Sequence, residues 1–214
     1  MIMEQKGQER TSVGRIEIVK NEKGALPIGG EVKSVGLMGV HSYRLLVSEK
    51  SGVVSGYGSL AESFRAAGFV VNGRGVETYE AYAAKRKNRL KAPGSCCIWP
   101  KRRMAYAEFP FFSEDLVENV VDFSDAVIVT LGRELCAGEE VRMEEGAYYL
   151  SRAEHELLRM VSARCEVKEK RLIVVLNTAY DVETESWSSF ADAIVKIGLP
   201  KQAEVGEIVK ELKG

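Results

Sequence analysis

The residues of this sequence that are best suited to chemistry are the carboxylates of one short segment. The segment follows an apolar run at residues 126–131 and contains five glutamates: Glu134, Glu139, Glu140, Glu144 and Glu145. Carboxyl groups act as general acids and bases, and adjacent ones such as Glu139 and Glu140 raise each other's pKa when they are partly buried, which suits a general acid. From composition alone, a solvated acidic loop is the simpler interpretation.

A few other residues give weaker indications of a site. His41 follows the first apolar run, and a lone histidine there is more often a hydrogen-bonded structural residue than a ligand. No G-x-S-x-G motif accompanies His41 or His155, so a Ser-His-Asp triad has no support. The glycines of residues 51–58 fit neither nucleotide-binding pattern, and a turn before a helix is the simpler interpretation. Trp99 and Trp187 are candidates either for stacking on the ring of a ligand or for packing.

The four cysteines and two histidines do not form a metal-binding pattern. Cys96 and Cys97 are adjacent, whereas Cys136 and Cys165 stand alone, so a redox pair or a zinc site is poorly supported. Reduced thiols of an intracellular protein are the simpler interpretation. We expect neither a metal ion nor an organic cofactor.

Charge and hydropathy exclude several classes of function. The chain of 214 residues has a formal net charge of −1, so no global field directs it to nucleic acid or to anionic membranes. Basic residues gather between positions 85 and 103 without the interleaved aromatic residues of a nucleic-acid site, and we interpret them as a solvated surface. No apolar run approaches the ~20 residues of a membrane helix. The sequence therefore predicts a cytoplasmic protein that binds neither nucleic acid nor membranes.

Short apolar runs alternate with helical patterns along the chain. The expected strands are residues 34–40, 68–71, 126–131, 172–176 and 193–199. The expected helices are residues 59–67, 76–89, 113–121, 151–163 and 202–212. Strands rich in valine and isoleucine that lack alternation are typical of a sheet covered on both faces. We predict an α/β fold, a three-layer helix-sheet-helix sandwich with a mostly parallel sheet of about five or six strands.

Local patterns predict where one helix begins, where the domain begins and where the site lies. Ser151 and Glu154 form the S-x-x-E pattern of a capping box ahead of an apolar stripe, which predicts the beginning of a helix. We expect residues 1–14, which are mostly polar, to be a flexible segment, and residues 15–214 to form one α/β-sandwich domain. A long polar loop at the carboxyl end of a buried strand is where an open α/β sheet places its chemistry. The acidic loop is therefore our candidate site.

An ordered set of motifs resembles one enzyme family. The motifs are IVKNEKGALPI (residues 18–28), KSVGLMGVHSY (33–43), SLAESFRAAGFVVN (59–72), AGEEVR (137–142), GAYYLS (146–151), LIVVLN (172–177) and Trp187. Together they resemble the second, α/β-sandwich domain of glycoside hydrolase family 3, the β-glucosidase family. The set covers most of the chain from about residue 15 onward.

The resemblance implies that the acidic loop serves retaining hydrolysis of a terminal β-linked glucosyl or related residue. In that family the glutamate of S/N-x-G-E-G-x-D-R is the general acid/base, and the matching position here is Glu139, directly after Gly138. We expect Arg142, Gly138 and His41 to contact the substrate. The sequence departs from the family pattern at Glu140, which replaces a glycine, and lacks the aspartate before Arg142.

The resemblance also implies a partner domain. The nucleophile of the family is an aspartate on a (β/α) barrel, and this chain has neither eight βα units nor the ~250 residues of a barrel. It would supply half of an active site and be inactive by itself. Two extra residues between Arg133 and Ala137 make Glu134 a rival for the acid role.

Two other classes of function stay open. One is a non-catalytic sandwich module that affects specificity or assembly, and the other, from the fold alone, is a flavodoxin-like binder of small molecules.

Overall fold

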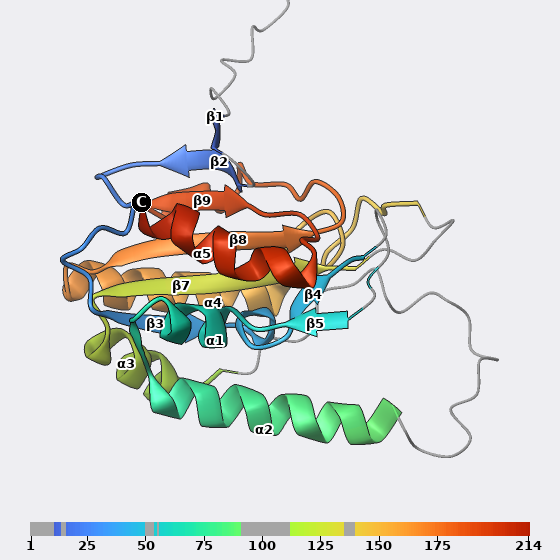
Figure 1. Ribbon diagram of the computed structural model, residues 1–214. Coiled ribbons are helices and arrows are strands. Elements are labelled where there is room, and N and C mark those ends of the chain that lie inside the picture. The colour runs from blue at the N-terminus through green and yellow to red at the C-terminus, as the bar shows by residue number, and fades with distance from the viewer. Residues whose placement is uncertain (1–10, 14–15, 50–53, 55, 91–111, 135–139) are drawn as a thin grey trace, which may run out of the picture.

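The computed structural model describes residues 11–13, 16–49, 54, 56–90, 112–134 and 140–214 (Figure 1). Within these residues, the main sheet has seven strands in the order β1-β2-β9-β8-β7-β3-β6. The strands are β1 (Thr11–Val13), β2 (Ile16–Asn21), β3 (Ser34–Met38), β6 (Val70–Val71), β7 (Ala126–Arg133), β8 (Arg171–Thr178) and β9 (Ala193–Lys196). The main sheet thus has a short strand at each edge.

The sheet is mostly parallel. Strands β9, β8, β7, β3 and β6 pair in parallel, whereas β2 is antiparallel to both β9 and β1. The predicted α/β fold is confirmed, and β1 and β2 extend the sheet beyond the strands expected from sequence. Strand β1 lies within the segment expected to be flexible, residues 1–14, of which residues 1–10 and 14 lie outside the described part.

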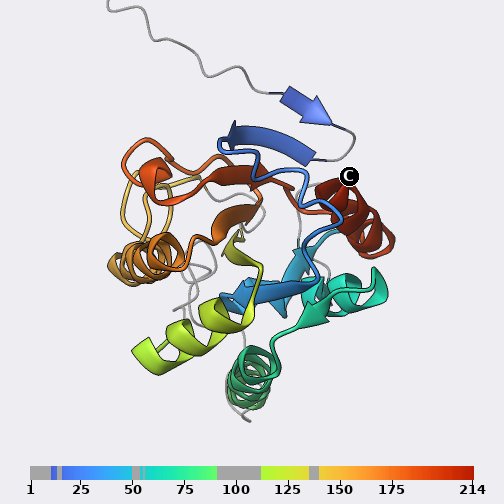
Figure 2. The same cartoon turned by 90° about the vertical axis from the view of Figure 1, so that its left-hand side faces the viewer.

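Helices cover both faces of the sheet. The helices of the described residues are α1 (Leu60–Ala66), α2 (Gly73–Leu90), α3 (Glu114–Phe123), α4 (Arg152–Val167) and α5 (Val205–Lys213). Figure 2 shows α3 and α4 together on one face, α1 and α5 together on the other, and α2 beside the edge formed by β3 and β6. All five predicted helices are present, although the last one begins with a separate 3-10 turn, Gln202–Glu204. None of the helices in the described residues is long and apolar enough to cross a membrane.

Serine side chains begin three of the helices. The Oγ atoms of Ser59, Ser113 and Ser151 each accept a hydrogen bond from the backbone N–H three residues later, which satisfies a donor that the helix leaves open. At Ser151 the side chain of Glu154 also accepts from the backbone N–H of the serine, at 2.9 Å. The predicted capping box is therefore confirmed.

Strand β7 is a fully buried interior strand of the main sheet. All eight of its residues are buried, and it pairs with β3 on one side and along its whole length with β8 on the other. Seven of these residues are apolar or small enough to pack between the two helix layers, and the eighth is the charged Arg133. The strand thus ends on a buried charge at the point where the acidic loop begins.

The carboxyl ends of β3, β7 and β8 lie together at one end of the sheet, which we call its carboxyl edge to distinguish it from the outer strands β1 and β6. A 3-10 turn, Val40–Ser42, follows β3, the acidic loop follows β7, and residues 179–187 follow β8. A two-stranded sheet, β4 (Leu45–Val47) and β5 (Gly56–Gly58), lies at the same edge and contacts both the turn and β8. Of the glycine-rich stretch, residues 51–53 and 55 lie outside the described part, and Gly56–Gly58 forms β5 rather than a turn.

Candidate functional site

The acidic loop begins at a buried ion pair. The guanidinium of Arg133 donates from Nη1 to Oε1 of Glu154 at 2.7 Å and from Nη2 to Oε2 at 2.8 Å. The side chains of both residues are almost inaccessible, with exposed fractions of 0% and 3%. A planar guanidinium matches the two oxygens of a carboxylate in this geometry. The end of β7 is thereby fixed to the first turn of α4.

The same two side chains also hold the far end of the loop. Arg133 donates from Nε to the carbonyl oxygen of Ala147 at 3.0 Å. Glu154 accepts from both the backbone N–H and the hydroxyl of Ser151, each at 2.9 Å. The loop therefore leaves and returns at one cluster of charged hydrogen bonds, in which each polar group has a partner.

The described acidic residues lie on both sides of the predicted catalytic position. Glu134 is half-buried next to the ion pair, and Glu140 is exposed. Arg142 is exposed and donates to the carboxylate of Glu144 at 3.3 Å. Gly138 and Glu139 lie outside the described residues, as do the other residues between 134 and 140, so their predicted roles stay predictions.

The second half of the loop is folded into a compact turn. The backbone N–H of Tyr148 donates to the carbonyl of Arg142 at 3.2 Å, and the N–H groups of Ala147 and Tyr149 both donate to the carbonyl of Glu144 at 3.2 Å. The carbonyl of Tyr148 accepts from the N–H of Glu183 at 2.9 Å. These contacts connect the acidic loop to the segment that follows β8.

The side chain of His41 packs between the turn after β3 and the end of β7. Its side chain is buried, and Nδ1 donates to the carbonyl oxygen of Arg44 at 3.2 Å. A Cβ atom added to Gly132 would lie 2.4 Å from the imidazole ring, so the ring rests directly on the backbone of β7. His41 therefore packs against Gly132, the residue that precedes Arg133, and this contact gives it a structural role. Its predicted contact with a substrate stays a prediction.

Asn177 organises the neighbouring strand end and was not singled out from sequence. Its Oδ1 accepts from the N–H of Leu46 at 2.6 Å, and its Nδ2 donates to the carbonyls of Leu46 at 3.0 Å and Gly198 at 2.7 Å. One buried amide thus connects β8 to β4 and to the turn after β9. The only sequence signal was the polar residue that ends the apolar run LIVVLN.

Aromatic residues near the site are mainly structural in the described part of the chain. Trp187 is fully buried, and its Nε1 donates to the carbonyl of Glu183 at 2.5 Å, so it packs in the core rather than stacking on a sugar. Trp99 lies outside the described residues. Burial raises the pKa of the Tyr180 phenol, as does the carboxylate of Glu154, whereas Arg133 lowers it. Tyr180 therefore remains protonated at neutral pH.

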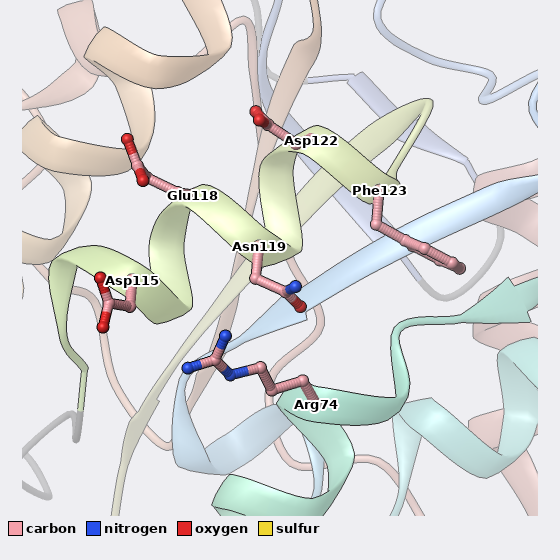
Figure 3. A pocket seen from close by; sticks show the side chains of 6 residues that line it. All are labelled: Arg74, Asp115, Glu118, Asn119, Asp122 and Phe123. Carbon is pink, nitrogen blue, oxygen red and sulfur yellow. The ribbon is translucent and has the colours of Figure 1, made fainter.

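A surface depression of about 520 Å³ lies away from this edge, between α2 and α3 (Figure 3). Figure 3 shows the guanidinium of Arg74 extended toward Asp115 and Asn119 of α3. Glu118 and Asp122 bind Arg164 of α4, at 3.2 Å and 2.6 Å. The depression is lined mainly by charged and polar side chains and shares no residue with the acidic loop, so it has no part in the candidate site.

Side chains that could bind a metal ion are not grouped together in the described part of the chain. Within the described residues, no group of three or more His, Cys, Asp or Glu side chains is placed to hold a metal ion. Cys165 is buried in α4, and burial raises the pKa of its thiol to about 12. Cys96, Cys97 and Cys136 lie outside the described residues. His155 is exposed on α4 with its ring against Phe190, as expected of a surface residue.

The fold and the loop together define the class of domain: an α/β sandwich that holds an acidic loop at the carboxyl edge of a mostly parallel sheet. The family model of the glycosyl hydrolase family 3 C-terminal domain matches residues 17–214. The chain therefore belongs to glycosyl hydrolase family 3, and the resemblance seen in its motifs is confirmed. No match was found among curated protein sequences.

Solved structures of bacterial β-glucosidases share this fold. β-Glucosidase 3B from Thermotoga neapolitana in complex with glycerol is 26% identical, with a TM-score of 0.74 over 93% of this chain and 27% of that one. Its complex with glucose gives 25% identity and a TM-score of 0.76 over the same shares. A β-glucosidase from Paenibacillus barengoltzii, 19% identical, shares the fold with a TM-score of 0.72 over 94% of this chain and 22% of that one. The chain thus spans about a quarter of the length of these enzymes.

Proposed function

We propose that this chain is the acid/base domain of a retaining glycoside hydrolase of the β-glucosidase type. A (β/α) barrel domain that carries the nucleophilic aspartate completes its active site. The observation that carries the proposal is the position of the acidic loop in a chain of this family: it leaves the carboxyl end of β7 and is held at both ends by Arg133. The similar β-glucosidases are about four times as long as the matched part, which agrees with a second domain.

The proposed reaction uses the carboxyl group of Glu139 twice. In the first step the barrel aspartate attacks the anomeric carbon, while Glu139 gives its proton to the glycosidic oxygen of the leaving group. In the second step the Glu139 carboxylate removes a proton from water, which attacks the glycosyl-aspartate ester and releases the sugar with the β configuration. Retention requires the two carboxyl groups to lie roughly 5–5.5 Å apart, so the loop must be held in place against the barrel.

The neighbours of Glu139 have supporting roles in this proposal. Glu140 and the half-buried Glu134 add negative charge near the acid, which favours its protonated form before reaction. Arg142 is exposed on the loop, bound to Glu144, and would orient the acid or bind a sugar hydroxyl. Gly138 would let the backbone approach the substrate. His41 would support the loop by packing against the end of β7, where the loop begins.

A second candidate function rests on the departures from the family motif. The loop reads G-E-E-V-R, without the glycine after the glutamate and without the aspartate before Arg142. A sandwich domain with a loop altered in this way would pack against the barrel and shape specificity without donating a proton. Glu134, two residues after Gly132, is the alternative acid if the loop is shifted.

The test is hydrolysis of 4-nitrophenyl β-glucoside by the chain alone and by the chain joined to its barrel domain. Each form is made with Glu139→Gln, with Glu134→Gln and, as a matched control on the same loop, with Glu145→Gln. We expect a silent lone chain, an active joined enzyme and a fall in kcat of roughly 10²–10⁴-fold with Glu139→Gln, because hydrolysis of the glycosyl-enzyme needs the base whatever the leaving group. The control variant should keep most of its activity.

The other outcomes separate the alternatives. Activity of the lone chain would show that the nucleophile lies within it. A joined enzyme that stays active with Glu139→Gln but loses activity with Glu134→Gln would assign the acid role to Glu134. Activity that survives both substitutions would favour the non-catalytic module.

A further inference from the structure

We propose that the buried Arg133–Glu154 ion pair is the positioning device of the acid/base loop. The inference rests on the proposed function and assigns Arg133 and Glu154 as positioning residues that act through the loop glutamate. Neither side chain reaches the surface at this edge, because their exposed fractions are 0% and 3%. They therefore act on the substrate only through the backbone that they hold.

The geometry fixes the loop at both ends with one guanidinium. Nη1 and Nη2 bind the carboxylate of Glu154 at 2.7 and 2.8 Å, Nε binds the carbonyl of Ala147 at 3.0 Å, and Nη1 also binds the carbonyl of Gly132 at 2.9 Å. The N–H of Ala179 donates to the carbonyl of Arg133 at 3.0 Å. The last residue before the loop is thus held through both its backbone and its side chain.

Helix α4 does not need this charge pair in order to form. Its apolar face, with Leu157, Leu158 and Val161, is buried in the core. A glutamine at the position of Glu154 would satisfy the capping box as well as a glutamate does. A buried ion pair carries a desolvation penalty that apolar side chains of similar volume avoid. The charges are therefore explained by the geometry that they enforce rather than by the stability of the helix.

Fixed geometry at this point matters because the acid position is only a few residues away. Glu134 follows Arg133 directly, and Glu139 lies five residues further along the chain. Displacing a catalytic group by about 1 Å lowers rates by roughly 10²-fold. A pair that holds Arg133 and Ala147 in a constant relation fixes the two ends between which the acid position lies.

The decisive variant removes both charges and keeps the volume. Arg133→Met combined with Glu154→Gln leaves no unpaired buried charge and preserves the capping box. Arg159→Met with Glu156→Gln is the matched control, because that bidentate pair on the same helix is exposed, with side-chain fractions of 55% and 46%. Arg133→Lys is the second variant, since lysine keeps the charge but cannot bind the carboxylate as a fork.

Two measurements read out positioning. In the chain alone, amide hydrogen exchange at Gly146, Ala147 and Tyr148 should become at least about tenfold faster in the double variant and stay unchanged in the control. In the joined enzyme, kcat/KM for methyl β-glucoside should fall roughly 10²-fold. The value for 2,4-dinitrophenyl β-glucoside should change less than about threefold, because that leaving group departs without a proton.

The remaining outcomes either overturn the proposal or move its test to the second variant. Unchanged exchange in the double variant would overturn the proposal, as would equal losses with both substrates, which indicate a general effect on folding or binding. If the double variant does not fold, Arg133→Lys carries the same two tests with a smaller expected loss. If the unaltered joined enzyme hydrolyses neither substrate, both the proposed function and the catalytic role of the pair are wrong. The exchange measurement then still decides whether the pair orders the loop.

Discussion

The imidazole of His41 packs directly against Gly132, near the end of β7 at the candidate site. The imidazole lies where a side chain on Gly132 would have to be, with an added Cβ only 2.4–2.5 Å from three ring atoms. An approach this close is possible for glycine alone, because every other residue carries a Cβ atom. The pair therefore sets the spacing between the turn after β3 and the end of β7.

Gly132→Ala is expected to destabilise the fold by about 1–3 kcal/mol, because the methyl group forces His41 out of its place. Chemical denaturation of the chain alone measures the change. Adding His41→Ala should recover a large part of the loss, since the two effects share one contact. Gly206→Ala is the control: an added methyl there meets no atom within 4 Å, and we expect it to stabilise α5 by roughly 0.5–1 kcal/mol. A similar loss at both glycines would contradict this explanation.

Single residues of the site were predicted unevenly from sequence. The carboxylates of the loop were visible by type, and Glu154 by its place in the capping box. Arg133 was not recognised, because an arginine beside an acidic loop has the pattern of a solvated charge. Its role depends on a partner 21 residues away whose carboxylate also caps a helix. Asn177 was missed for the same reason, since its partners, Leu46 and Gly198, come from two distant segments.

At the scale of elements, Asp125 joins the beginnings of two neighbouring strands. Its Oδ2 accepts from the N–H groups of Lys33 and Ser34, each at 2.9 Å, and from the hydroxyl of Ser34 at 2.8 Å. The backbone N–H groups of Lys33 and Ser34 hold the pKa of this carboxyl below its usual range, and the Ser34 hydroxyl lowers it further. Asp125 thus aligns β3 with β7 at the end opposite the site.

Asp125→Asn should lower stability at neutral pH by an amount on the order of 1 kcal/mol, because this exposed carboxylate is screened by solvent. The carboxyl has a depressed pKa in the folded state, so its contribution is present above the unfolded pKa of about 3.9 and is lost as the pH falls through the folded value. Unfolding curves of both proteins from neutral to acidic pH should therefore converge at low pH. A constant difference at every pH would contradict the assignment.

Elements were predicted well where one signal dominated. The interior strands are continuous runs of valine, isoleucine and leucine, and α4 has both its capping box and its apolar stripe. Strand β2 was not predicted because Glu17 and Lys20 interrupt its apolar residues, and its pairing with β9 gives it order that its composition does not show. Strands β4 and β5 have three residues each, too few for a pattern to emerge.

For the whole molecule, the N-terminal boundary can be tested by deletion. Ile16 is buried, and Lys20 donates to two backbone carbonyls at 2.9 and 2.7 Å near the beginning of β9. Deleting residues 1–10 should shift the melting temperature by less than about 2 °C, whereas deleting residues 1–21, with β1 and β2, should lower it by at least about 5 °C. Thermal unfolding followed by circular dichroism distinguishes the two. Equal effects would place the boundary elsewhere.

The two edges of the sheet have a consequence for how this domain behaves in isolation. Strand β6 has two residues and β1 has three, so each edge offers few unpaired backbone groups to a strand of another molecule. Short edge strands are a common protection against edge-to-edge aggregation. In the proposed function this domain would meet a barrel through its loops, and such edges would discourage polymerisation with copies of itself.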